Sequence, residues 1–339
     1  MSQFILRRLL GMGAVLFLVS VITFLLMHAI PGGPFSREKP LPEATVALLN
    51  AKYNLDAPII EQYLDYVGDI VLPRVTYGRI PPSATEDYLV NISLPAFMGD
   101  QSALRWINFG PTYGSRSRSV NDIFRDSLPI SFQLGIAAMT VAMAVGIPLG
   151  AAAALKRNTI FDYAGMGVAV FGVSLPVIIT APVLQYLFGV QLQALPPTGW
   201  GEIRHMILPA FALGFVNSAL IARLTRASLL QVMNEDYIRT ARAKGLSERM
   251  VVIGHAIKNG MIPVVTILGP LFAILVTGSF VVETFFGIPG MGRYFVTSIR
   301  GRDYPVIMGT ILLFAAFVSV ANLVVDIIYA WLDPRIRYD

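Results

Sequence analysis

The segment Asn234–Pro263 reads NEDYIRTARAKGLSERMVVIGHAIKNGMIP and separates two apolar stretches that are each long enough to cross a membrane. Between Asp236 and Lys258 it carries five cationic side chains and only two acidic ones. A short basic segment between two apolar stretches is typical of a loop on the cytoplasmic side of a membrane protein. This segment therefore sets the orientation of the stretches on either side of it.

The polar residues and the glycine of this segment predict two short helices with a sharp turn between them. Asn234 can cap the first helix, and Glu235 and Asp236 suit the positive end of its dipole. Gly245 stands where a residue with positive φ would end that helix, because glycine has no Cβ to clash there. Ser247 can cap the second helix.

Two interpretations of the segment are open from these residues alone. Two capped helices at a fixed angle form a shaped projection, which suits docking into a cleft of a soluble partner. A basic amphipathic helix that rests on anionic lipid would carry similar charges.

The composition indicates an integral membrane protein. Of 339 residues, 55% are hydrophobic and only 14% are charged, and the mean hydropathy is +0.64. Soluble domains carry about 25% charged residues. The formal net charge of +5 needs no nucleic-acid partner, because cytoplasmic loops alone require cations. The sequence holds no cysteine, which excludes disulfides and thiolate chemistry.

Six segments are apolar over the roughly 20 residues that a membrane-crossing helix needs. Helices are expected because an open strand cannot satisfy its backbone in lipid. We predict an all-α polytopic membrane protein with six transmembrane helices. The segments are Leu9–Ile30, Pro129–Leu155, Phe161–Phe188, His205–Leu230, Met261–Phe285 and Tyr304–Leu332.

The cations that flank these segments predict that both termini lie in the cytoplasm, since cytoplasmic loops are enriched in Lys and Arg. With the N-terminus inside, the inner flanks hold Arg7, Arg8, Lys156, Arg157, the five cations of the basic segment, Arg335 and Arg337. The short outer loops hold only Arg204, Arg293, Arg300 and Arg302.

This orientation divides the chain into three parts. Residues 1–30 form the N-terminus and the first transmembrane helix. Residues 31–126 form a large external loop that is partly helical. Residues 127–339 form a five-helix core, which includes a cytoplasmic loop at 234–260.

Within the external loop, helical spacing of apolar residues predicts helices over Glu43–Tyr53 and Pro58–Leu72. Five prolines between Pro73 and Pro111 make long regular elements unexpected there. Ser119-x-x-Asp122 has the spacing of a capping box and predicts a short helix that leads into the second span.

Small residues and prolines within the spans predict how the helices pack and bend. Gly146 and Gly150 permit close packing in the second span. Pro176 is expected to bend or locally loosen the third span.

Charged groups inside the spans are few. Asp326 lies within about two turns of the inner end of the last span. We expect it to form a structural ion pair or to act as an anchor at the inner face, with Arg223 or Arg226 as its partner. A carrier driven by protons or sodium would need acidic residues nearer the middle of the membrane.

The sequence lacks the common catalytic patterns. It contains no Gly-x-x-x-x-Gly-Lys-Ser/Thr loop, so ATP binding by a P-loop is not expected. His28, His205 and His255 share no metal-ligand spacing. We predict that the chain is not an enzyme and holds neither a metal nor a cofactor.

A Gly/Pro-rich turn follows the fifth span and reads FFGIPGMG over Phe285–Gly292. Small and rigid residues at such density specify a tight backbone path. The turn can shape an outer gate, or it can simply be a tight turn.

The basic segment resembles the cytoplasmic coupling loop of binding-protein-dependent ABC importer permeases. The sequence RTARAKGL at 239–246 is similar to the form in the dipeptide/oligopeptide branch. Arg239, Thr240 and Lys258 depart from the superfamily-wide pattern, in which Glu, Ala and Pro are usual. The turn after the fifth span resembles the family's E-x-x-x-G-x-P-G-x-G pattern. The resemblance covers most of the chain except part of the first external loop.

This resemblance implies the type I ABC importer permease fold and a subunit of an ATP-driven peptide importer that works by alternating access. It implies coupling to the ATPase through Asp236, Tyr237, Arg239, Thr240, Ala241, Arg242, Ala243, Lys244, Gly245 and Leu246. It implies an outer gate or turn at Glu283, Gly287, Pro289, Gly290 and Gly292.

The implied partners are a second homologous permease subunit, two nucleotide-binding ATPase subunits that hold ATP and Mg, an extracytoplasmic substrate-binding protein and membrane lipid. The implied location is the cytoplasmic (inner) membrane of a bacterium or archaeon. Alternatives are an ion-coupled secondary transporter, a membrane scaffold, or the same ABC class with a nickel chelate, glutathione or a sugar as cargo.

Overall fold

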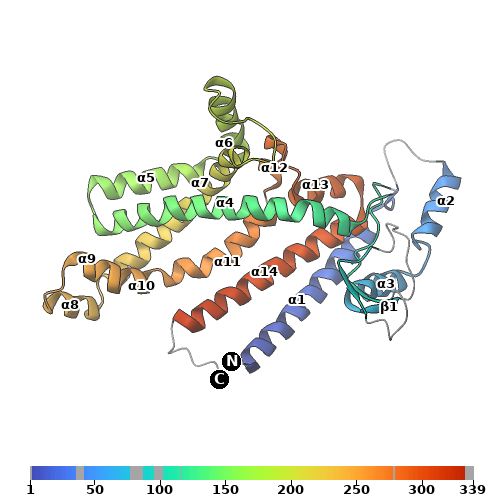
Figure 1. Ribbon diagram of the computed structural model, residues 1–339, viewed down its shortest axis with the longest axis horizontal. Coiled ribbons are helices and arrows are strands. Elements are labelled where there is room, and N and C mark those ends of the chain that lie inside the picture. The colour runs from blue at the N-terminus through green and yellow to red at the C-terminus, as the bar shows by residue number, and fades with distance from the viewer. Residues whose placement is uncertain are drawn as a thin grey trace. The chain divides into compact units, whose positions relative to one another are not determined.

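The computed structural model describes residues 2–35, 42–76, 87–94, 102–115, 117–277 and 279–332. Its ribbon is drawn in Figure 1. The chain divides into two compact units. The first contains Met1–Arg8, Ile130–Gly292 and Phe317–Asp339, and the second contains Leu9–Pro129 and Arg293–Ala316.

Within the described residues, four helices are long and apolar enough to cross a membrane. They correspond to the predicted first, second, fourth and sixth spans. They are α1 (Ser2–Ala29), α4 (Val120–Leu155), α7 (Ile203–Val232) and α14 (Tyr304–Leu332).

Two bent helix pairs bring the count of candidate spans to as many as six in the described parts of the chain. The first pair joins α5 (Ile160–Ser174) to α6 (Val177–Leu184), which continues as the wide-turned helix η2 (Gln185–Gln191). Its two arms meet at 96°. In the second pair, the helical arm Glu248–Gly260 meets α11 (Ile262–Thr277) at 48°.

The predicted third span is therefore broken rather than one straight helix. Leu175 precedes Pro176 and is extended, with φ −93° and ψ 110°. The proline ring disfavours helical geometry in the residue before it, so α5 ends there. The predicted fifth span is also divided, because α11 is followed by the separate helix α12 (Phe280–Phe286).

The first unit has an apolar core in which α4 and α7 come into close backbone contact. A Cβ added at Gly146 would lie 2.6 Å from the carbonyl oxygen of Ser218, and one at Gly150 would lie 2.4 Å from that of Ala222. The prediction of close packing at these two glycines is confirmed. Gly214 of α7 makes the reciprocal approach to the carbonyl oxygen of Ala138 in α4.

The second unit contains α2 (Glu43–Lys52) and α3 (Ile59–Val71), as the spacing of apolar residues predicted. An aromatic and aliphatic cluster forms its core. The buried members are Phe24, Met27, Tyr304, Ile307 and Met308.

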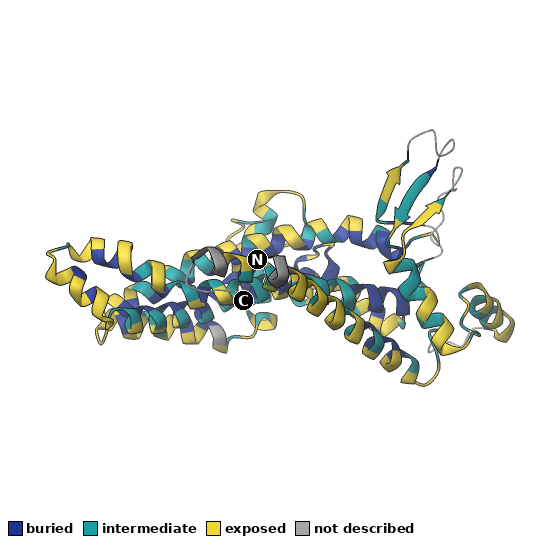
Figure 2. Ribbon diagram, turned by 90° about the horizontal axis from the view of Figure 1, so that it is seen from below, coloured by how far each residue is buried: buried dark blue, intermediate teal, exposed yellow. Residues whose placement is uncertain are grey.

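This unit also contains a small sheet, so the all-α prediction is wrong in this detail. Strands β1 (Arg74–Thr76), β2 (Val90–Ser93) and β3 (Ala103–Trp106) form an antiparallel sheet of order β1-β3-β2. Three or four residues are too few for periodicity to reveal a strand. Figure 2 shows these strands as exposed or half-buried.

The capping box before the second span is confirmed. The Ser119 N–H donates to Asp122 Oδ2 at 3.1 Å, and the Asp122 N–H donates to Ser119 Oγ at 2.9 Å. The helix that begins here is α4 itself, which runs without a break from Val120 into the second span.

Candidate functional site

The basic loop is folded into a compact elbow, a name used below for residues 234–260. Figure 1 shows its helices together at the C-terminal end of α7. They are α8 (Asp236–Ala243), α9 (Glu248–Met250), the wide-turned helix η3 (Val251–Ile257) and α10 (Lys258–Gly260).

Helix α8 buries one narrow face and exposes the rest. Ile238 is fully buried and Ala241, one turn later, is 6% exposed. The remaining residues of the helix are exposed. Residues three apart lie on one face of a helix, so these two side chains anchor α8 while its polar residues face outward.

The buried face of the elbow packs against the ends of two long helices. Ile238 and Ala241 share a cluster with Ala154 near the end of α4 and Leu229 near the end of α7. Val251 and Ala256 of η3 belong to the same cluster and are fully buried. Displacement of the elbow would therefore be transmitted to two spans.

Gly245 ends α8 as predicted. Its φ is +77°, the left-handed region that only glycine enters without a Cβ penalty. Its N–H donates to the carbonyl of Arg242 at 2.9 Å, and the Leu246 N–H donates to that of Ala241 at 3.4 Å. This pair of bonds is the Schellman arrangement, which satisfies carbonyls at a helix end.

Two side-chain contacts tie α8 to the arm that follows it. Arg242 Nη2 and Nε donate to the two carboxylate oxygens of Glu248 at 2.7 and 3.1 Å. Asn259 Nδ2 donates to the hydroxyl of Tyr237 at 2.9 Å. The elbow thus has contacts across its turn near both ends of α8.

The Arg242 guanidinium lowers the pKa of the Glu248 carboxyl, which lies in the elbow outside the predicted spans. A lowered pKa means that the ion pair is fully formed above the ordinary value of 4.5 and is lost as the pH falls below it. The pair is therefore intact at neutral pH.

The predicted caps of the elbow are only partly correct. Asn234 does not cap α8, because Glu235 occupies the N-cap position and the Asn234 amide donates back to the carbonyl of Leu230. Ser247 occupies the N-cap of α9 as expected, but its side chain makes no capping hydrogen bond.

All ten residues predicted for coupling lie in α8 and the turn after it. Two of them, Tyr237 and Arg242, form the hydrogen bonds to Asn259 and Glu248 described above. A third, Ala241, is buried in the cluster that anchors the helix. Arg239 bonds only loosely within α8, with Nη1 3.3 Å from Asp236 Oδ1 and both side chains largely exposed. The elbow also exposes Met250 and Ile253.

The Gly/Pro-rich turn, together with the end of α12 before it (residues 283–292, called the outer turn below), contains a buried carboxylate. Glu283 of α12 is fully buried, and its Oε1 accepts hydrogen bonds from Ser131 Oγ at 2.8 Å and Ser279 Oγ at 2.7 Å. The Met291 N–H donates to Ser131 Oγ at 2.8 Å. The turn is thereby joined to α4 through Ser131.

Each glycine of this turn is required for a different steric reason. Gly287 has φ +66°. A Cβ at Gly290 would lie 2.5 Å from the Glu283 carboxyl, and one at Gly292 would lie 2.7 Å from the Phe280 backbone. The tight path of the predicted turn is confirmed. Ser131 and Ser279 were not predicted as part of it, because neither lies in the Gly/Pro-rich stretch.

The outer turn and the elbow contact α4 at two well-separated positions. Ser131 bonds to the turn, whereas Ala154 packs in the elbow cluster. At 1.5 Å per residue these positions are separated by about 35 Å of helix, close to the thickness of a bilayer core of about 30 Å. The two clusters are therefore joined by one continuous helix.

The predicted ion-pair partners of Asp326 are wrong. Asp326 Oδ2 lies 3.1 Å from Arg8 Nη2, on α1. Arg226 instead forms a bidentate pair with Asp162 of α5, at 2.7 and 2.8 Å. Spacing along one helix does not show which distant segments pack against it. The sequence alone could therefore not identify Arg8 as the partner of Asp326.

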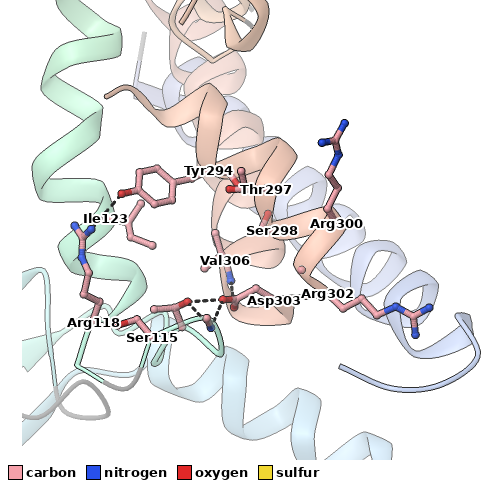
Figure 3. Close-up of a pocket in the computed structure, with 13 residues that line it drawn as sticks. Ser115, Arg118, Ile123, Tyr294, Thr297, Ser298, Arg300, Arg302, Asp303 and Val306 are labelled. Atoms are coloured by element: carbon pink, nitrogen blue, oxygen red, sulfur yellow. Dashed lines mark hydrogen bonds between the residues drawn. The ribbon is translucent and has the colours of Figure 1, made fainter. Parts of the chain in front are cut away.

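A polar cavity of about 1070 Å³ lies in the second unit, between the start of α4, helix α13 (Met291–Gly301) and the start of α14. Arg118 Nη1 donates to the Tyr294 hydroxyl at 3.1 Å, and Asp303 accepts from Thr112 and Gly114. Figure 3 shows Arg300 and Arg302 pointing away from these groups. The polar groups on its wall thus largely bond to one another.

No group of three or more potential metal ligands occurs among the His, Cys, Asp and Glu side chains that the structure describes.

Comparisons with known proteins agree with one another. The family described as "binding-protein-dependent transport system inner membrane component" matches residues 146–338, and its N-terminal counterpart matches residues 1–83. The dipeptide transport system permease protein DppB of Bacillus subtilis is 41% identical, and the match covers 99% of this chain and 98% of that protein.

The oligopeptide transport system permease protein OppB of Salmonella typhimurium is 38% identical over the whole of both chains. Among solved structures, an inward-facing conformation of the MetNI methionine ABC transporter matches with a TM-score of 0.53 and 16% identity. That match covers 62% of this chain and 96% of the other.

Proposed function

Because the chain belongs to the family of binding-protein-dependent transport system inner membrane components, we propose that it is the permease subunit of an ATP-driven importer of di- and oligopeptides. It lies in the inner membrane with both termini in the cytoplasm, and it moves cargo by alternating access. The names of its relatives support peptides as cargo over nickel chelates, glutathione or sugars.

One observation carries the mechanism, namely that the elbow is anchored to two spans while its polar face is exposed. Ile238 and Ala241 hold it against α4 and α7, and the cationic residues of α8 face outward. A soluble subunit that grips this projection can push on both spans at once. A flexible loop would absorb the same movement without passing it on.

The energy for this movement comes from partner subunits. The sequence contains no P-loop, so two separate ATPase subunits hold ATP and Mg and bind the elbows of two permease subunits. The second elbow belongs to a homologous permease chain. An extracytoplasmic binding protein delivers the cargo.

The outer turn is connected to the elbow through α4 and moves with it. Its buried Glu283 joins α12 to Ser131 of α4, and α4 also contacts the elbow. Movement of α4 driven from the cytoplasm therefore reaches the residues that shape the outer gate. This connection supports a gating role for Glu283, Gly287, Pro289, Gly290 and Gly292.

An ion-coupled carrier is less well supported by the acidic groups that the structure describes. Asp162 and Asp326 form ion pairs, and Glu283 is hydrogen-bonded by two serines. A coupling carboxylate has to gain and lose its ion, which an intact ion pair opposes.

Gly245→Val in the complete reconstituted importer tests the proposal. Valine is strained at φ +77°, so it should change the angle of the elbow. We expect substrate-stimulated ATP hydrolysis to fall about tenfold or more, while the subunit still inserts into the membrane.

The matched control is Gly254→Val, also in the elbow, where an added Cβ has no neighbour within 4 Å and φ is not positive. It should retain coupling. Native stimulation and transport in Gly245→Val would contradict the proposed role of the elbow, and peptide uptake by this chain without any ATPase would contradict the whole assignment.

A further inference from the structure

The two arginines of α8 that lie one turn apart have different surroundings. Arg242 makes two hydrogen bonds to Glu248, six positions later and beyond the turn at Gly245. Among the residues that the structure describes, Arg239 pairs with Asp236, within the same helix. Contact across the turn restrains the angle between two helices, whereas contact within one helix does not.

The geometry of the Arg242 contact suits a restraint. A bidentate guanidinium–carboxylate pair fixes orientation as well as distance, because both groups are planar. The two side chains are 41% and 59% exposed, so the pair contributes little to overall stability. Its effect falls on the angle between α8 and α9.

A second restraint lies near the other end of α8. The Tyr237 hydroxyl accepts a hydrogen bond from Asn259 of α10, and Ile238 beside it is fully buried. With one contact near each end, α8 cannot swing about Gly245 without breaking at least one of them.

From this arrangement we propose that Arg242 and Glu248 are positioning residues that hold α8 at its working angle, and that Arg239 is the arginine of α8 that contacts the ATPase. Tyr237 and Asn259 assist at the other end of the helix. The proposal rests on the proposed function, since it assigns separate tasks within the coupling elbow.

Exchanging the charges of an ion pair distinguishes a residue that positions α8 from one that contacts the ATPase. In the reconstituted importer, Arg242→Gln and Glu248→Gln should each lower substrate-stimulated ATP hydrolysis about two- to fivefold, the range expected for an exposed ion pair. The exchange R242E/E248R restores the pair with the charges reversed. We expect it to recover stimulation to within about twofold of the native importer.

The matched control exchanges the charges of the loose pair, as D236R/R239E. If Arg239 contacts the ATPase, restoring its internal partner cannot compensate for its reversed charge, so stimulation and co-purification of the ATPase should both stay low. Tyr237→Phe and Asn259→Leu should each reduce stimulation, and the double variant should be no worse than either single one.

The results that would overturn this inference differ from the result that would overturn the proposed function. If R242E/E248R is as impaired as the single variants, Arg242 is itself a contact residue and the positioning proposal is overturned, while Gly245→Val still reports on the elbow. If D236R/R239E behaves as native, the assignment of Arg239 is overturned. If the native importer shows no substrate-stimulated ATP hydrolysis, the proposed function fails instead.

Discussion

Glu283 illustrates what a single residue contributes to this molecule. A carboxylate without exposed surface is costly unless its oxygens are hydrogen-bonded. Here two serines donate to Oε1, and one of them, Ser131, comes from 152 positions away. The sequence pattern identified Glu283 and the glycines around it. It could not identify Ser131, because nothing in spacing along the chain brings α4 to this turn.

At this scale, Gly290→Ala should destabilise the turn. The added Cβ would meet the Glu283 carboxyl at 2.5 Å and Ser131 Oγ at 2.6 Å, so the carboxylate must leave its hydrogen bonds. The expected cost is about 2–4 kcal/mol, which combines overpacking with lost hydrogen bonds.

Thermal unfolding of the purified subunit in detergent measures this effect. Gly254→Ala is the control, since its Cβ would have no neighbour within 4 Å. An unchanged melting temperature in Gly290→Ala would mean that the carboxylate is not confined as described.

At the scale of elements, the sequence predicted where most helices lie, but not how sharply the third span bends. Apolar length predicted α1, α4, α7 and α14 because hydropathy alone marks such spans. The break at Pro176 was expected as a bend or a local loosening, and the two arms meet at 96°. The angle of a bend depends on the helices packed around it, which the sequence does not show. The three strands were missed for another reason, since they are too short for an alternation of apolar and polar residues to be visible.

The contact between α4 and α7 gives a prediction at this scale. Gly150→Leu would place side-chain atoms where Ala222 O and Thr225 Cβ lie 2.4 and 2.7 Å from the added Cβ. The helices would have to separate, at a cost of about 3 kcal/mol or more.

Chemical unfolding in micelles, compared with Gly167→Leu, checks this expectation. Gly167 is exposed and has no neighbour within 4 Å of an added Cβ, so the same substitution should be tolerated there. Equal stability of both variants would show that the small residues of α4 are not what brings the helices together.

At the scale of the whole molecule, the proposed function of the chain is to pass movement from ATPase subunits to its membrane spans. Its basic segment was recognisable from sequence as a shaped, basic loop, because the helix end at Gly245 and the surrounding charges are local features. The anchoring by Ala154 and Leu229 and the contact between Arg242 and Glu248 were not predicted. They depend on tertiary packing, and they make the loop a rigid elbow.

The most direct measurement is cross-linking with a bifunctional thiol-reactive reagent attached to a single engineered cysteine. The reagent labels this chain at one position because the native sequence has no cysteine. Ala243→Cys on the exposed face of α8 is placed in the complete importer, and Val190→Cys in η2 serves as the exposed control. We expect Ala243→Cys to cross-link to the ATPase subunit with a yield that changes when ATP is added, and Val190→Cys to give no such product. Absence of any cross-link from α8 to the ATPase in an importer that still hydrolyses ATP would contradict the claim that the elbow is moved by the ATPase.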